Sequence, residues 1–179
     1  MTMRKTQLIE VERKYLLKSV SKKENWAKEF IIFQWFENVN EHKCIKLKII
    51  FDLIALKQTI VRITKTRIDS ITCYKEVEYL NIKDIDLKQY MGTGFILKRR
   101  AIANKVFLDY FYRSNKVCEY LLEIEDDIED EDLRKMGIVI DTEVSEKSEY
   151  LNANMCVAFQ KEDYQILCFL LQMIPGWKI

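Results

Sequence analysis

Charged residues recur at every second position in many short segments of this sequence, and each segment carries mostly one sign. Near the start, for example, Glu10 and Glu12 alternate with Ile9 and Val11. The cations at such positions are Lys14, Lys46, Lys48, Lys65, Arg67, Lys98 and Arg100. The anions are Glu10, Glu12, Glu76, Glu78, Asp109, Glu123 and Glu125. Carboxylates bind hard divalent cations, and Lys and Arg bind phosphate oxygens, so this set suits a triphosphate held with Mg²⁺ or Mn²⁺.

Strands are the elements that can place such residues together, because alternate side chains of a strand lie on one face. The alternation of apolar and polar residues predicts eight strands. They cover residues 8–17, 30–37, 43–51, 59–67, 70–80, 94–102, 105–113 and 117–126. Consecutive strands joined by short turns favour an antiparallel sheet, and about eight of them can close into a barrel.

Four segments show the apolar spacing of helices instead: residues 22–28, 86–90, 129–135 and, most clearly, 161–173. Alternation alone fits a barrel that carries its charges on the outside equally well. However, the apolar strand faces need cover, and helices can supply it from outside. We therefore expect an α+β fold, an eight-stranded antiparallel closed β-barrel with covering helices, whose charged faces line a tunnel.

The composition excludes several other kinds of site. The 179 residues predict a single domain, 1–179, and include only 4 Gly and 1 Pro. No glycine-rich nucleotide loop and no G-x-S-x-G hydrolase motif is present, so side chains must hold any bound phosphate. With His42 as the one imidazole, a His/Cys zinc site is not expected, and a metal would be a hard cation on carboxylates.

The charge balance and the cysteines predict the surroundings of the protein. A net charge of +1 does not favour nucleic acid, and the most apolar stretch, residues 166–174, is too short to span a membrane. The 5 cysteines include no C-x-x-C pair, and the first residues do not form a secretory leader. We expect a cytoplasmic monomer or homodimer whose partner is a small triphosphate-containing molecule.

The ordered motifs resemble those of a known family. Residues 10–14, Glu-Val-Glu-Arg-Lys, resemble the E-x-E-x-K signature of the CYTH superfamily, also called triphosphate tunnel metalloenzymes. Later segments that resemble the family pattern are 46–48 (R-x-R), 76–78 (E-x-E), 98–100 (K-x-R), Asp109, 123–125 and 143–152. The resemblance implies an eight-stranded tunnel that hydrolyses tripolyphosphate, nucleoside triphosphates or thiamine triphosphate, or that converts ATP to cyclic AMP.

The resemblance also implies roles for single residues. The implied ligands of Mg²⁺ or Mn²⁺ are Glu10, Glu12, Glu123 and Glu125, with Asp109, Glu76 and Glu78 as further or outer ligands. The implied triphosphate-binding residues are Lys14, Lys46, Lys48, Lys65, Arg67, Lys98 and Arg100. Glu10, Glu12, Lys14 and Lys65 are the implied catalytic residues. Hydrolysis of inorganic tripolyphosphate is the favoured activity, because residues 12–16, Glu-Arg-Lys-Tyr-Leu, and residues 143–152 resemble the bacterial tripolyphosphatase branch more than the cyclase branch.

Departures from the family pattern keep two alternatives open. Lys46 and Lys48 replace the two arginines of R-x-R, and a lysine lacks the bidentate geometry of an arginine. Ile63, Tyr74 and Ser148 stand where the family has Thr, Arg and a basic residue. One alternative is a class IV adenylate cyclase, because its charged residues would be the same. The other is a non-catalytic protein that binds polyphosphate or nucleotide.

Overall fold

A computed structural model describes residues 5–21, 26–125 and 128–174 of the chain. The strands are β1 (Lys5–Val11), β2 (Arg13–Val20), β3 (Lys28–Val39), β4 (Lys43–Asp52), β5 (Lys57–Arg67), β6 (Thr72–Tyr79), β7 (Gly94–Ala103), β8 (Val106–Arg113), β9 (Tyr120–Ile124), β10 (Ile138–Glu143) and β11 (Val157–Ala158). The α-helices are α1 (Asp130–Lys135) and α2 (Lys161–Met173), and the 3₁₀-helices are η1 (Ile82–Asp84), η2 (Leu87–Tyr90) and η3 (Ser148–Tyr150). No helix within the described ranges has the length and apolar character that a membrane span requires.

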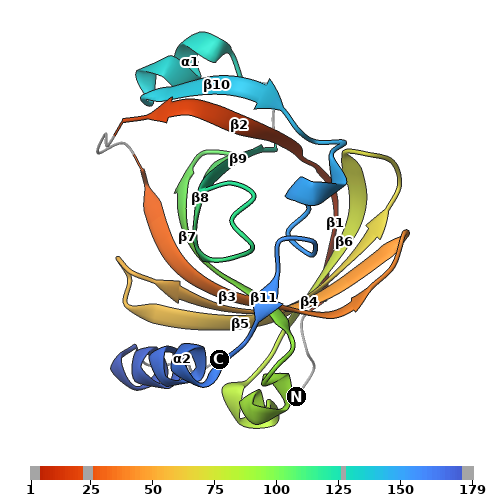
Figure 1. The fold of residues 1–179 in the computed structure, drawn as a ribbon, viewed down its shortest axis with the longest axis vertical. Coiled ribbons are helices and arrows are strands. Elements are labelled where there is room, and N and C mark those ends of the chain that lie inside the picture. The colour runs from red at the N-terminus through yellow and green to blue at the C-terminus, as the bar shows by residue number, and fades with distance from the viewer. Residues whose placement is uncertain (1–4, 22–25, 126–127, 175–179) are drawn as a thin grey trace.

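The strands form one curved, antiparallel, tunnel-like sheet (Figure 1). Its hydrogen-bonded order is β1-β6-β5-β4-β3-β7-β8-β9-β2-β10, and the short β11 pairs with β7. The sheet has eleven strands within the described residues, compared with the eight expected. Each expected strand is present, and the difference arises because the first is divided in two and because β10 and β11 are added.

The expected closure of the barrel is not confirmed, since the hydrogen bonds of the described residues do not join the two ends of the sheet, β1 and β10, into a ring. The predicted strand 8–17 is divided at Glu12 into β1 and β2. β1 pairs with β6, whereas β2 pairs with β9. The backbone N–H of Glu12 donates instead to the carbonyl oxygen of Ile71 at 2.9 Å. The β1–β6 pair and the β2–β9 pair are therefore connected through Glu12 of the chain rather than by a ladder of backbone hydrogen bonds between strands.

The helix predictions have mixed outcomes. The helix expected at 161–173 is confirmed as α2, and α1 covers nearly all of 129–135. Segment 86–90 forms only the 3₁₀-helix η2. In the expected helix 22–28, residues 22–25 lie outside the described residues, and Lys28 already belongs to β3. That part of the prediction is wrong because Lys28 pairs with Ile102 of β7, which requires extended backbone.

Both α-helices cover outward, apolar sides of the sheet. α2 packs through Leu167 against a cluster that includes Phe33, Trp35 and Phe51 of the central strands. α1 packs through Leu133 against a second cluster under β2, β8 and β10. In Figure 1 both helices lie outside the curved sheet. Because the apolar sides are covered from outside, the alternate positions are left facing the inside of the sheet.

One part of this inner face is apolar. Ile96, Phe111 and Leu121 follow the same alternation as the charged residues of β7, β8 and β9, and they pack with Val144 and Met155. The segment that carries Met155 lies within the curve of the sheet in Figure 1. Apolar side chains thus fill one region of the interior of the sheet.

The packing beside α2 gives a test of the fold. Phe159, just before α2, is 1% exposed and contacts the rings of Trp35 and Phe95 at centroid distances of 5.1 and 4.9 Å. We expect Phe159→Ala to lower the free energy of unfolding by about 3–5 kcal/mol, because it leaves a cavity. Phe169→Ala, at a 60% exposed position of α2, should change it by less than about 0.5 kcal/mol. Urea unfolding measures both, and equal losses would contradict the described packing.

Candidate functional site

A cavity of about 550 Å³ lies on the charged side of the sheet. Eight Lys and Arg residues and six Asp and Glu residues line it. The cavity brings together ten of the residues singled out by the sequence: Glu10, Glu12, Lys14, Lys46, Lys48, Lys65, Arg67, Arg100, Glu123 and Glu125. Most of them are buried or half-buried, so the protein holds an unusual number of charges away from bulk water.

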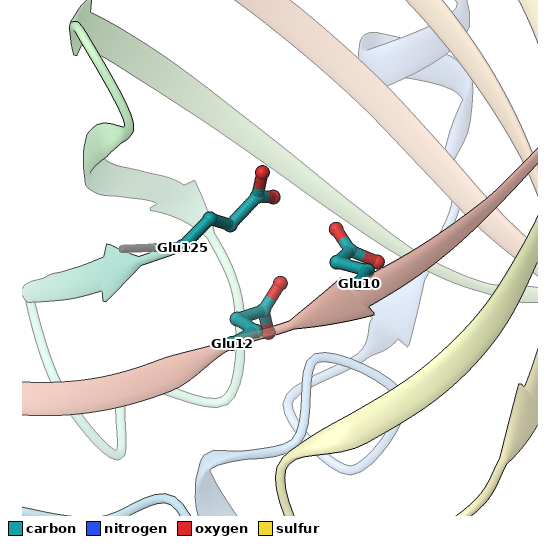
Figure 2. A group of neighbouring side chains, drawn as sticks. All are labelled: Glu10, Glu12 and Glu125. Atoms are coloured by element: carbon teal, nitrogen blue, oxygen red, sulfur yellow. The ribbon is translucent and has the colours of Figure 1, made fainter. Parts of the chain in front are cut away.

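Three of these carboxylates converge. Glu10 of β1, Glu12 between β1 and β2, and Glu125 directly after β9 have carboxylate oxygens within 4.8 Å of one another. Figure 2 shows the three side chains pointing toward a common space. Oxygen ligands of this kind are those that Mg²⁺, Mn²⁺ and Ca²⁺ prefer. The donor set therefore fits a hard divalent cation, as the sequence led us to expect for these three residues.

Lysines on neighbouring strands neutralise this cluster. The Nζ of Lys65 lies 2.7 Å from Glu10 and 3.3 Å from Glu12. The Nζ of Lys75 lies 3.0 Å from the other oxygen of Glu10, and that of Lys14 lies 3.4 Å from Glu12. Such pairs offset the cost of removing carboxylates from water.

The two ends of the cluster titrate differently. Burial opposes ionisation of Glu10, but the charges of Lys65 and Lys75 outweigh it and hold its pKa well below the usual range. Burial, together with the hydrogen bond and the negative charge of Glu10, raises the pKa of Glu125 to about 7. Near neutral pH, Glu10 is therefore a carboxylate, whereas Glu125 exchanges a proton.

Two buried lysines have no carboxylate beside them. Within the described part of the chain, no carboxylate oxygen lies within 4 Å of Nζ of Lys46 or Lys48, which are 7% and 9% exposed. Burial and the charge of Lys65 lower the pKa of Lys46 to about 8. Burial and the charges of Lys46 and Arg100 hold the pKa of Lys48 well below its usual range. A bound anion would relieve this repulsion, so these lysines fit an anion site.

Arg100 and Lys98 are held by acidic neighbours. Asp109 accepts two hydrogen bonds of 2.6 Å from Arg100 and another from Lys98, and Arg100 also donates to Glu123. Lys98 and Asp109 are both fully buried and do not line the cavity. Asp109, expected as a metal ligand, therefore orients Arg100 in this structure. Glu123 is likewise bound by Arg100 and lies outside the group of three converging carboxylates.

The structure departs from the expectation for Glu76 and Glu78, which do not line the cavity. Glu76 accepts a hydrogen bond of 2.8 Å from Gln7, and Glu78 lies 3.7 Å from Arg62. The neighbouring positions of β6, Cys73 and Lys75, face the cavity instead. The reason is that the period of a strand distinguishes two faces without telling which one is inside.

Lys75 and Asn152 are two of the cavity residues that the sequence analysis did not place in the site. Asn152 donates to Glu123 at 3.4 Å, while its buried Oδ1 has no hydrogen-bond partner among the described residues. Asn152 ends the segment 143–152 whose pattern resembles the family, so that segment was the available signal. No comparable signal pointed to Lys75. It lies on the opposite face of β6 from Glu76 and Glu78, the two residues that the sequence analysis selected.

Comparisons with known proteins add structural neighbours. No family model matches the sequence, and no curated protein matches it. The crystal structure of the inorganic triphosphatase NE1496 is similar with a TM-score of 0.47 and 15% identity, over 84% of this chain and 96% of that one. A structure of the hypothetical protein NE1496 gives 0.46 and 16%, over 84% and 99%. An inorganic triphosphatase is thus among the structural neighbours of this chain.

The buried pair beneath Arg100 yields a stability prediction. In Asp109→Asn the fully buried Lys98 loses its carboxylate partner, so we expect the free energy of unfolding to fall by about 3–5 kcal/mol. The matched control is Asp141→Asn, because the pair of Asp141 with Lys18 is exposed and spans 4.0 Å. Chemical unfolding followed by circular dichroism measures both. A loss for Asp109→Asn no larger than for the control would contradict the described pairing.

The pKa of Glu125 predicts a pH effect on the metal-free protein. Because the folded pKa, about 7, exceeds the value of 4.5 expected when unfolded, the folded state binds the extra proton. The resulting stabilisation is complete below the unfolded pKa and is lost as the pH rises through the folded one. The stability of the wild type relative to Glu125→Gln should therefore fall between about pH 5 and about pH 8 in EDTA. Glu149→Gln, at an exposed carboxylate, should show no such trend, and a rise for Glu125→Gln would contradict the prediction.

Proposed function

We propose that this protein hydrolyses a triphosphate with the help of Mg²⁺ or Mn²⁺ inside the cavity of the curved sheet. One observation carries the proposal. The same cavity contains the cluster of Glu10, Glu12 and Glu125 and also Lys46 and Lys48, which have no carboxylate oxygen of the described residues within 4 Å. A triphosphate bound to a divalent cation presents a cation for the first group and anionic oxygens for the second.

The residues divide the work by charge. Glu10, Glu12 and Glu125 hold the cation, while Lys14 and Lys65 fix the carboxylates in place. The bound cation supplies charge neutralisation at phosphate oxygens and a water of lowered pKa. The remaining cavity cations, Lys46, Lys48, Arg67 and Arg100, hold the phosphates and stabilise the charge that develops on the leaving group.

Hydrolysis of inorganic tripolyphosphate is the favoured reaction. A water oxygen forms a bond to the terminal phosphorus, the bond from that phosphorus to the bridging oxygen breaks, and phosphate and diphosphate leave. The two protons of the attacking water leave with the phosphate and diphosphate products or pass to solvent. Nucleoside and thiamine triphosphates carry the same phosphate chain and are the further substrates of this proposal.

We place this activity in the cytoplasm, in a monomer or homodimer. All five cysteines are free in the structure, although Cys44 and Cys73 both line the cavity. Free thiols beside a metal site persist best in a reducing compartment.

The test is phosphate release from tripolyphosphate by the purified protein with Mg²⁺ or Mn²⁺. We expect EDTA to abolish release, and Glu10→Gln and Glu12→Gln to lower kcat by at least about 100-fold, since each removes a charge from the cluster. Glu76→Gln is the matched control, because this glutamate lies outside the cavity and should keep turnover near that of the wild type.

Other outcomes point to other functions. Formation of cyclic AMP from ATP without phosphate release would identify a cyclase. Tight metal-dependent binding of tripolyphosphate in calorimetry, with no turnover over hours, would identify a binding protein. Equal loss of activity in Glu76→Gln and Glu10→Gln would argue against the cavity as the active site.

A further inference from the structure

Both oxygens of Glu10 are bound by ammonium groups. Oε2 lies 2.7 Å from Nζ of Lys65, and Oε1 lies 3.0 Å from Nζ of Lys75. The side chain of Glu10 is only 6% exposed, so water cannot readily replace either partner. Any divalent cation that binds Glu10 must therefore displace an ammonium group or share an oxygen with it.

The two lysines differ in how firmly they are held. Lys65 has a second carboxylate, Glu12, at 3.3 Å. Within the described part of the chain, Glu10 is the one carboxylate within 4 Å of Nζ of Lys75. Lys75 also has 22% of its side chain exposed, compared with 19% for Lys65. Lys75 is thus the partner that an arriving cation displaces at the smaller cost.

A released Lys75 stays inside the same cavity, which also holds Lys46 and Lys48. Its ammonium group then lacks a carboxylate and becomes available to an anion, as those two lysines already are. Conversely, an anion that attracts Lys75 leaves an oxygen of Glu10 free for a cation. Each ligand therefore favours the other through one side chain, and such coupling is reciprocal.

We propose that Lys75 couples cation binding to phosphate binding. Its ammonium group pairs with Glu10 in the absence of ligands and moves to the phosphate chain when both ligands bind. The proposal rests on the proposed function for the identity of the two ligands. Without phosphate, the ammonium group of Lys75 stays paired with Glu10 and lowers the affinity of the cavity for a divalent cation. With both ligands, Lys75 joins the phosphate-binding residues, so the cavity fills with cation and phosphate together.

The first experiment measures Mn²⁺ binding without any phosphate, by calorimetry, to the full chain. We expect Lys75→Met to lower the Kd for Mn²⁺ by about tenfold or more, because the competing charge is gone. Lys75→Arg keeps the charge and should match the wild type. Lys83→Met removes an exposed lysine on η1, outside the cavity, and should also match it. If Lys75→Met does not fold, as judged by circular dichroism, Lys75→Gln takes its place.

The second experiment repeats these titrations with imidotriphosphate, a slowly hydrolysed analogue. The factor by which the analogue tightens Mn²⁺ binding should be smaller in Lys75→Met than in the wild type or in Lys75→Arg. Association of Mn²⁺ with the analogue in solution is the same for every variant and cancels in this comparison. A merely structural role of Lys75 would weaken Mn²⁺ binding in the variant rather than strengthen it.

The proposal is overturned if Lys75→Met binds Mn²⁺ no more tightly than the wild type, or if Lys75→Arg tightens Mn²⁺ binding as much as Lys75→Met does. It is also overturned if neither the wild type nor Lys75→Met binds Mn²⁺. These readouts do not involve turnover. A protein that shows the expected shifts but releases no phosphate would refute the proposed hydrolysis and leave the role of Lys75 supported. Phosphate release by the wild type, with no change in the Kd for Mn²⁺ in Lys75→Met, would support the proposed hydrolysis and refute the role of Lys75.

Discussion

The cost of keeping charge out of water governs the interior of this protein. Carboxylates and ammonium groups that face inward must find partners of opposite sign, or the folded state is destabilised. Lys65 between Glu10 and Glu12, and Arg100 between Asp109 and Glu123, meet this requirement. Each of these pairs joins different strands, so the ion pairs and the curvature of the sheet depend on each other.

Charge pairing is incomplete in one direction only. The acidic side of the cavity is neutralised by Lys14, Lys65 and Lys75. Lys46 and Lys48 repel each other, and no carboxylate oxygen of the described residues lies within 4 Å of either ammonium group. Such an excess lowers stability in the empty state, and it favours whatever anion restores the balance. Residues at functional sites commonly sacrifice stability in this way.

The covering helices decide which face of the sheet can hold this network. Leu167 of α2 and Leu133 of α1 bury apolar strand positions from outside, and the capping box of Gln160 and Asp163 fixes the start of α2. Asp163 also accepts a hydrogen bond from Arg113 of β8, which attaches the helix start to the sheet. With the outer side closed by apolar contacts, the polar positions are left to the interior.

The sequence by itself determined β3 to β9 and α2, because period-two and period-3.6 patterns are local properties of the chain. It also determined that Glu10, Glu12 and Lys14 share a face. It did not give β10, β11 or the division of the first strand at Glu12. Only the tertiary structure decided which face of β6 points inward, and there Lys75 replaced Glu76 in the cavity. Strand alternation fixes the relation between neighbours in sequence, whereas the inside is defined by contacts between distant strands. Those contacts arise only when the whole sheet curves around its charges.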